Sequence, residues 1–188
     1  MQQNLTSSIF QCKMSIILED ILKGTPGITS VEGANLLENC IVMLHRQGHK
    51  PTTTLELAGI SYIPIDIIWR DNCTLQMERT YADQQVNTER AAVCLSILLT
   101  LKLTDYTIIM RSRKGTGFDY YLGQKEIQTF EPQARLEISG IENETKTNTI
   151  EGRFRQKMEQ TSPTDASGLP AYISIIEFSK PKALFNTK

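Results

Sequence analysis

The chain has 188 residues, of which 40% are hydrophobic and 22% are charged, and its formal net charge is −1 at pH 7. This composition is typical of a globular protein with a packed core, and it excludes wholesale disorder. A net charge near zero gives no general attraction to nucleic acid, so binding to a polyanion would need a local group of basic residues.

Cysteine usage predicts a reducing compartment. Cys12, Cys40, Cys73 and Cys94 are well separated, and none belongs to a CxxC pair. We therefore expect buried free thiols rather than disulfides or zinc ligands. The N-terminus lacks a basic segment followed by an apolar one, and the longest apolar run, residues 91–101, is too short to span a bilayer. These features predict a cytoplasmic protein that does not bind membranes.

Residues 1–85 predict two helices and a pair of strands. Apolar residues recur at helical spacing over residues 16–22, before a glycine that ends the pattern. A second helix is expected to begin at residue 29 or 30 and to stop at Gly48. These elements belong to an N-terminal extension that we expect to pack on the core that follows it, as one structural unit.

The two strands of the extension are expected over residues 54–60 and 62–69, because both segments are rich in β-branched and aromatic residues. Pro64 has no amide hydrogen to donate to a ladder, so we expect an edge pair. The polar segment that follows predicts a further short strand over residues 75–77.

Residues 86–188 predict the order helix, strand, strand, strand, helix, strand. The expected elements are a helix from Glu89 to about Leu103 capped by Asn87 or Thr88, strands over 107–110, 118–122 and 136–139, a helix over 149–160 and a strand over 171–178. The return through the second helix requires a parallel neighbour, whereas the tight turns before it make antiparallel neighbours. The predicted fold class is therefore α/β, with a mixed sheet flanked by helices. The tail after residue 180 is expected to pack through Leu184 and Phe185 or to fray.

Two carboxylates stand inside apolar segments of neighbouring predicted strands. Asp119 lies within FDYYL and Glu137 within LEIS. A buried acid is costly unless it is paired, exposed at a strand end or bound to a cation, and two neighbouring acids repel unless a cation lies between them. Glu137 shares one face of its strand with Arg135 and Ser139, because side chains alternate along a strand. We expect Asp119 and Glu137 to bind Mg²⁺, which prefers oxygen ligands.

This element order, with Asp119 on the second strand and Glu137 on the third, resembles the PD-(D/E)XK nuclease fold over residues 89–178. The resemblance implies a restriction-endonuclease-like αβββαβ core. It also implies a nuclease that acts on nucleic-acid phosphodiesters with Mg²⁺ or Mn²⁺, of a type found in bacterial restriction or defence. Asp119 matches the motif Asp, and Glu137 matches the acid of (D/E)XK. Glu89 matches a third metal ligand on the first core helix, and Gln156 matches a supporting glutamine of some members.

The chain departs from this family at its lysine. Ser139 stands two residues after Glu137, where the family has the lysine that orients or activates the attacking water. Lys157, on the following helix, is the candidate for a migrated replacement, with Ser139 in support. The alternative is a site without a lysine that is inactive. The proline that precedes the motif Asp in the family is also absent.

A basic loop, residues 111–117 with the sequence RSRKGTG, precedes the first acid. We expect Arg111, Arg113 and Lys114 to contact phosphates of a nucleic acid, with glycine amides approaching the backbone closely. Arg153, on the later helix, adds a further basic group. The alternative is a solvated hairpin turn in which glycine supplies a positive φ.

His45 and His49 have the HxxxH spacing that can bind a metal when both lie on one helix. Gly48 is expected to end the helix before His49, and the motif lacks the glutamate of HExxH. We therefore expect no zinc site at this pair.

Three functions remain open on the sequence alone. The first is the metal-dependent nuclease. The second is a catalytically inactive nuclease-fold subunit that binds or scaffolds a complex, which Ser139 and the near-zero net charge favour. The third is an interaction protein whose acids are structural, with Glu137 paired to Arg135 or Arg153 and Asp119 capping a turn. The partners implied are nucleic acid, another protein or a second copy of the chain.

Overall fold

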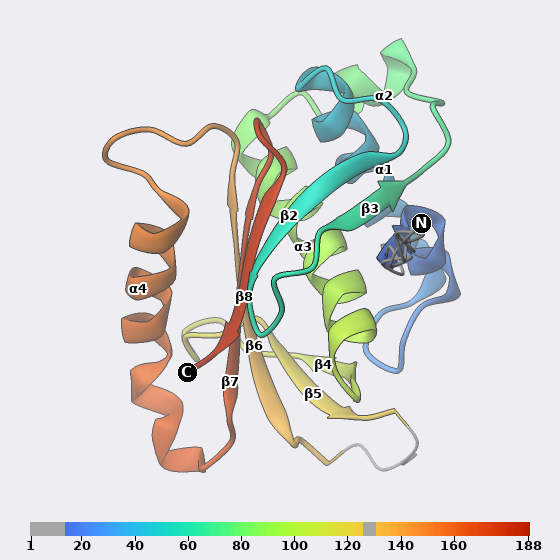
Figure 1. The fold of residues 1–188 in the computed structure, drawn as a ribbon. Coiled ribbons are helices and arrows are strands. Elements are labelled where there is room, and N and C mark those ends of the chain that lie inside the picture. Colours follow the sequence, from blue (N-terminus) through green and yellow to red (C-terminus); the bar gives the residue numbers. More distant parts are fainter. Residues whose placement is uncertain (1–13, 126–130) are drawn as a thin grey trace, which may run out of the picture.

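An eight-stranded mixed sheet lies at the centre of the structure, a computed structural model that describes residues 14–125 and 131–188. Its strands follow the order β1-β3-β2-β8-β7-β6-β5-β4 (Figure 1). They are β1 Met14–Ile17, β2 Thr53–Gly59, β3 Ile65–Ile68, β4 Tyr106–Arg111, β5 Tyr120–Gln124, β6 Ala134–Ile141, β7 Ala171–Glu177 and β8 Lys182–Thr187. The helices are α1 Ser30–Arg46, α2 Leu75–Thr80, α3 Gln84–Leu103 and α4 Ile150–Thr161, with 3₁₀ segments η1 Leu18–Lys23 and η2 Ser162–Ser167. The predicted α/β fold with a mixed sheet flanked by helices is confirmed.

The C-terminal half has the predicted connections. β4, β5 and β6 are antiparallel neighbours, whereas β7 returns parallel to β6 through α4. Glu137 on β6 pairs with Ile173 on β7, a strand in the interior of the sheet. The order helix, strand, strand, strand, helix, strand from α3 to β7 is therefore as predicted.

Helices cover both faces of the sheet (Figure 1). α3 packs against β4, β6 and β7 on one face, and α1 packs on α3. α3 is apolar on most sides, and its Ala91, Cys94 and Leu99 are fully buried. A helix that is apolar all round is stable when it lies between two other layers. No helix in the part of the chain that the structure describes is long and apolar enough to cross a membrane.

α4 covers the opposite face of the sheet (Figure 1). Its Phe154 and Met158 pack, together with Ile150, on Ile173 and Ile175 of β7. The remaining positions of α4 are largely polar, so this helix has one apolar face, as expected for a helix on the surface of a sheet.

α1 and α4 begin where the sequence predicts, and a threonine caps each of them. Thr29 accepts a hydrogen bond from the amide of Glu32, and Thr149 accepts one from the amide of Gly152. The predicted start of α3 is wrong: the cap is Asp83 rather than Asn87 or Thr88, and the helix begins at Gln84. The reason is that Asp83 offers a cap one turn earlier.

Asn87, the rejected cap of α3, lies buried between α3 and α1. Its side-chain amide donates to the main-chain oxygen of Asn39 on α1 at 2.8 Å. Its side-chain oxygen accepts a hydrogen bond from Arg46 at 3.2 Å. The polar side chain therefore joins two helices rather than starting one of them.

The helix predicted over residues 16–22 is wrong in part. Residues 14–17 form β1, which pairs in parallel with β3, and only residues 18–23 turn as η1. β3 therefore has neighbours on both sides, and among the described residues β1 is the edge strand at this end of the sheet. A run of isoleucines has the β-branched side chains that pair well in a sheet, and this tertiary pairing decides its structure.

The short strand predicted over residues 75–77 is also wrong, because this segment starts α2. Thr74 accepts a hydrogen bond from the amide of Met77 at 3.2 Å and so caps the helix. A threonine placed three residues before a free amide gives the backbone this local alternative to a strand.

The C-terminal tail forms β8, a strand between β7 and β2, rather than a frayed end. Phe185 and Ala183 are buried on it, and both lie in the main core. β8 pairs antiparallel with β7 and parallel with β2. Strands from the N-terminal and C-terminal halves therefore belong to one sheet, joined by the last strand of the chain.

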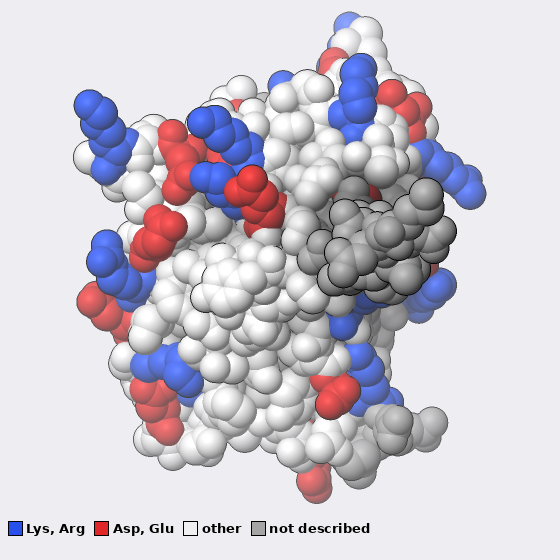
Figure 2. Space-filling view, in the orientation of Figure 1, with Lys and Arg blue, Asp and Glu red and all other residues white. Residues whose placement is uncertain are grey.

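On the face of the molecule that Figure 1 shows, neither positive nor negative side chains form a continuous patch. Figure 2 shows Lys and Arg interspersed with Asp and Glu around a broad uncharged area. This mixture agrees with the net charge of −1. Attraction of a polyanion would have to come from a local group of basic residues elsewhere on the surface.

Candidate functional site

The two predicted acids meet where β5 begins beside β6. β5 starts at Tyr120, so Asp119 lies directly before the strand and not inside it. The amide of Asp119 donates to the main-chain oxygen of Leu136 at 2.9 Å. The amide of Ile138 donates to the Asp119 carboxylate at 2.8 Å. The Ile138 amide lies beyond the last residue of β6 that pairs with β5, so the Asp119 carboxylate accepts its hydrogen bond instead of a strand carbonyl. The same bond places the Asp119 carboxylate beside Glu137.

Glu137 is a buried carboxylate with one satisfied and one unsatisfied oxygen. Its side chain is 2% exposed. Oε1 accepts hydrogen bonds from Lys157 at 2.5 Å and from Gln160 at 3.0 Å. Oε2 has no hydrogen-bond partner among the described residues. A buried oxygen left without a partner costs about 1–3 kcal/mol, and more when it is charged.

Another buried acid of the sheet shows what a purely structural carboxylate looks like here. Glu177, at the end of β7, is fully buried. It accepts hydrogen bonds from the amides of Ser179 and Lys180, both at 2.9 Å, and from the Ser179 hydroxyl. Both of its oxygens are satisfied by the turn to β8. Glu137 differs because one of its oxygens is satisfied by side chains of α4, whereas no described residue donates a hydrogen bond to the other.

The acid pair is electrostatically strained in the absence of a cation. Burial, followed by the negative charge of Asp119, raises the pKa of Glu137 to about 7, against the opposing effect of Lys157. Burial also raises the pKa of Asp119, while the amide of Ile138 and the charge of Lys157 oppose it. Two carboxyl groups in hydrogen-bonding reach of each other do not both ionise readily. Near neutral pH the pair therefore holds a proton or needs a cation.

Lys157 reaches this pair from α4, as predicted. Its side chain is 17% exposed, and its amine also donates to Gln160 at 3.0 Å. Gln156, the glutamine predicted to support the site, is exposed and lines neither cavity at the acids. Gln160 makes the contact in its place. The sequence does contain an indication of this contact: Gln160 lies three residues after Lys157, and residues three apart share one face of a helix.

Arg135, Glu137 and Ser139 all point from β6 towards α4 and η2, as the alternation of the strand predicts. Arg135 is not the partner of Glu137. It pairs with Asp165 at 3.0 Å. The expectation that Glu137 is neutralised by Arg135 or Arg153 is therefore wrong, since the cation at Glu137 is Lys157.

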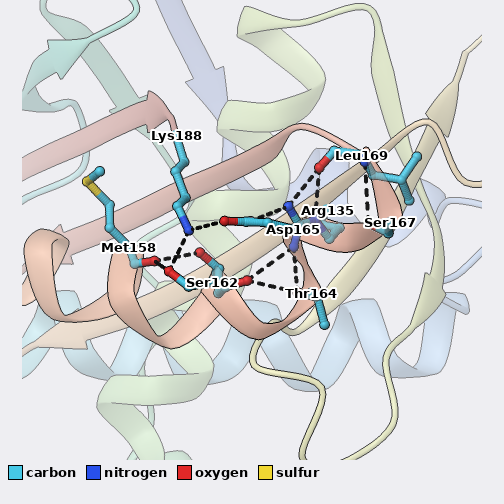
Figure 3. A network of polar contacts seen from close by, with 9 residues as sticks. Arg135, Met158, Ser162, Thr164, Asp165, Ser167, Leu169 and Lys188 are labelled. Carbon is cyan, nitrogen blue, oxygen red and sulfur yellow. Dashed lines mark hydrogen bonds and ion pairs between the residues drawn. The ribbon is translucent and has the colours of Figure 1, made fainter.

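Arg135 instead holds the segment that follows α4 (Figure 3). Its guanidinium donates to the main-chain oxygens of Leu169, at 2.7 and 3.0 Å, and Thr161, at 3.2 Å, and to the Thr164 hydroxyl. Lys188 adds a second cation to Asp165 at 2.6 Å. This network fixes the end of α4, from which Gln160 reaches Glu137.

Ser139 stands in the place where the resemblance would put a lysine, and Arg153 covers it. A guanidinium nitrogen of Arg153 donates to the Ser139 hydroxyl at 3.3 Å, and another donates to Asn148 at 2.8 Å. Arg153 therefore lies against β6, and two of its hydrogen bonds are made to other residues of the same chain. Only part of its donor capacity remains for a phosphate.

Two cavities open at the acid pair, and Asp119 lines both of them. The larger, of about 680 Å³, is lined by both acids, by Gln160 and by the loop that carries Arg111, Arg113 and Lys114. The smaller, of about 310 Å³, is lined by a different set that shares some of these residues: Glu89, Arg90, Val93, Arg111, Asp119, Ile138, Ser139, Gly140, Arg153 and Lys157. The basic loop thus faces the acids, as predicted, and Arg111 borders both cavities.

The loop over residues 112–119 is held in a fixed shape at its base. The amide of Ser112 donates to the main-chain oxygen of Asp119 at 2.8 Å. Gly115 and Gly117 have φ values of 92° and 81°. A Cβ on Gly117 would lie 2.4 Å from the main-chain oxygen of Gln160. Glycine is therefore required at 117 both by the backbone conformation and by the close approach of α4.

Glu89 lies on the first turns of α3 and borders the smaller cavity with Asp119 and Lys157. Its side chain is exposed and accepts a hydrogen bond from Gln85 at 3.3 Å. The structure therefore brings Glu89 to the rim of the site and not into the buried pair.

No protein-family model matches this chain, and no curated protein or solved structure matches it significantly. The class that the fold and site define is an α/β protein whose mixed sheet carries a buried acid pair, with a lysine beside one acid and a basic loop over both.

Proposed function

We propose that this protein is a nuclease-like enzyme that hydrolyses phosphodiesters of nucleic acid with Mg²⁺ or Mn²⁺, on a restriction-endonuclease-like core. The observation that carries the proposal is the Oε2 atom of Glu137, a buried carboxylate oxygen that receives no hydrogen bond from the described part of the chain and lies next to a second acid. A structural ion pair would not need the second acid, and repulsion between the acids would oppose it.

The donor set fits a hard divalent cation. Asp119 and Glu137 supply carboxylate oxygens, and Glu89 stands at the rim as a third candidate. Mg²⁺ keeps several waters and needs only one or two carboxylates besides the substrate. When bound, it would polarise a phosphodiester and lower the pKa of a bound water. The Lys157 amine would balance part of the carboxylate charge and orient a water or a phosphate oxygen beside Glu137.

The basic loop supports nucleic acid as the substrate class. Arg111, Arg113 and Lys114 line the same cavity as the acids, and their side chains are exposed to solvent. Phosphate contacts from such residues position a nucleic acid without reading its sequence. The free glycine backbone at Gly115 allows a phosphate to approach the loop closely.

The experiment is a cleavage assay on single-stranded and double-stranded DNA and RNA with Mg²⁺ or Mn²⁺. We expect Asp119→Asn and Glu137→Gln each to lower cleavage by 100-fold or more, on the order of the loss of a main catalytic group. Glu159→Gln, an exposed acid on α4, is the matched control and should cleave like the wild type. Circular dichroism and the melting temperature establish that each variant is folded.

The alternative proposal is an inactive nuclease-fold subunit that binds nucleic acid or a protein partner. Arg153 favours it, because its guanidinium, which has hydrogen-bond donors and no acceptor, lies against Ser139, where the resemblance would put the lysine. If no substrate is cleaved but nucleic acid binds and Arg113→Ala weakens it, this alternative replaces the nuclease.

A further inference from the structure

Three potential metal ligands of different kinds converge far from the acid pair in the sequence. They are His45 in the last turn of α1, Cys73 in the segment before α2, and Glu78 on α2. One ligand atom from each lies within 4.8 Å of those of the other two. Imidazole, thiolate and carboxylate are the three side-chain groups that zinc sites use.

The separations fit one ion. The His45 Nε2 and Glu78 Oε1 atoms are 3.4 Å apart. Two ligands about 2.0–2.1 Å from a tetrahedral Zn²⁺ lie about 3.3 Å from each other. The imidazole and the carboxylate are therefore already spaced like ligands of one ion, and the Cys73 sulfur lies within 4.8 Å of a ligand atom of each.

The chemistry of the set selects zinc over magnesium. A Cys73 thiolate and the Glu78 carboxylate supply two negative charges, which balance one Zn²⁺, and a neutral His45 adds none. Thiolate and imidazole are ligands for Zn²⁺ rather than for Mg²⁺. Cys73 is a free cysteine and partly accessible, and the side chains of His45 and Glu78 are 48% and 37% exposed, so an ion can enter.

The neighbouring histidine does not belong to this group. The His49 ring bonds to the main-chain oxygen of Phe178 at 2.6 Å. The ring of His49 is thus engaged at the end of β7, and the potential ligands that lie near His45 come from a different part of the chain. Sequence spacing could not show this, because His45 and Cys73 meet only after α1 and β3 have been placed.

The orientation of α2 is held by a second contact beside the ligands. Arg46, next to His45 on α1, donates to the main-chain oxygen of Glu78 at 3.0 Å. This bond fixes the backbone of the residue that carries the carboxylate. α1 and α2, which carry two of the three ligands, are thus tied together by a bond that does not depend on the ion.

We propose that His45, Cys73 and Glu78 bind one Zn²⁺ ion, with water in the fourth position, and that the ion clamps α2 to the end of α1. The chain would then hold a zinc clamp separate from the acid pair. The prediction from the sequence that all cysteines are plain free thiols would be wrong for Cys73.

The test is a titration of the full-length metal-free protein with Co²⁺, followed by competition with Zn²⁺. Co²⁺ in the zinc site should give tetrahedral d–d bands together with a thiolate-to-cobalt charge-transfer band, and Zn²⁺ should remove both. Cys73→Ser should abolish the charge-transfer band. Absence of that band in the wild-type protein, or its persistence in Cys73→Ser, would overturn the proposal.

Two further comparisons separate this site from the acid pair. Glu78→Gln should weaken Zn²⁺ binding at least about tenfold, whereas Glu56→Gln, an exposed acid on β2, should not change it. The double variant Asp119→Asn/Glu137→Gln should keep the cobalt spectrum. Loss of the spectrum there would place the metal at the acid pair instead. With Zn²⁺ about 100-fold above its Kd, the melting temperature of the wild type should rise by about 5 °C or more.

Discussion

At the scale of single residues, Glu137 connects the stability of the protein to its proposed chemistry. Its burial and the neighbouring Asp119 disfavour its ionised form, and Lys157 only partly offsets them. A position that served stability alone would be filled better by a neutral side chain. The retained charge makes sense when it is neutralised by a bound cation.

This strain predicts the pH dependence of stability without metal. Because the folded-state pKa of Glu137 is raised to about 7, its contribution to stability is fully present below its ordinary value of 4.5 and is lost as the pH rises through 7. Relative to Glu137→Gln, the free energy of unfolding of the wild type should fall by up to about 3 kcal/mol over this range. Urea unfolding in a chelator measures it, and parallel pH profiles of the two proteins would contradict it.

Lys157 should affect the reaction more than the fold. Lys157→Met keeps much of the side-chain volume but removes the amine that contacts Glu137 and Gln160. We expect cleavage to fall by about 100-fold to 10,000-fold, as for the loss of a group that orients or transfers a proton. Lys146→Met, at an exposed lysine, is the control. Equal activity of Lys157→Met and wild type would exclude a role for this amine.

At the scale of elements, the return from β6 through α4 and η2 to β7 builds the site. β6 supplies Glu137, and α4 supplies the two side chains that hold its Oε1 atom. The Arg135 network fixes the end of α4 against β6 and η2 (Figure 3). The position of the lysine relative to the acids thus depends on contacts that involve neither group.

Arg135→Lys tests this dependence. A lysine keeps the charge but cannot make the forked set of bonds to Leu169, Thr161 and Asp165. We expect the free energy of unfolding to fall by about 2–4 kcal/mol, because buried acceptors lose their donors. Chemical denaturation measures the change. Arg155→Lys, at an exposed arginine of α4, should stay within about 0.5 kcal/mol of the wild type, and an equal effect of both would contradict the network's role.

At the scale of the whole molecule, local sequence patterns predict the α/β fold class and the order of elements from α3 to β7, but they do not predict every strand pairing or side-chain contact. The order from α3 to β7 follows from periodicity and turns, and the proximity of Asp119 to Glu137 follows from neighbouring strands. The sequence does not single out Gln160, because the resemblance implies a supporting role for Gln156. β1 and β8 were missed because short segments become strands through pairing with residues far away in the sequence. The meeting of Cys73 with His45 is likewise a product of the tertiary fold.

The place of β8 gives a prediction about the intact chain. Removing residues 182–188 would leave β2 and β7 without their common neighbour and remove Phe185 from the core. We expect this truncation to unfold the whole protein and not only to remove one strand. The loss of a buried Phe alone lowers the free energy of unfolding by about 3–5 kcal/mol. Circular dichroism measures the outcome. A truncated protein with native spectrum and melting temperature would show that the two halves of the sheet hold without β8.

The most direct measurement of the central claim is calorimetric titration of Mg²⁺ into the metal-free wild type and into Asp119→Asn/Glu137→Gln at about pH 8, above the raised pKa of Glu137. Cys73→Ser serves as a background in which the proposed zinc ligands are incomplete. We predict one saturable Mg²⁺ site in the wild type and in Cys73→Ser, and none in the double variant. No saturable binding to the wild type, or equal binding to the double variant, would contradict a cation held by these two acids.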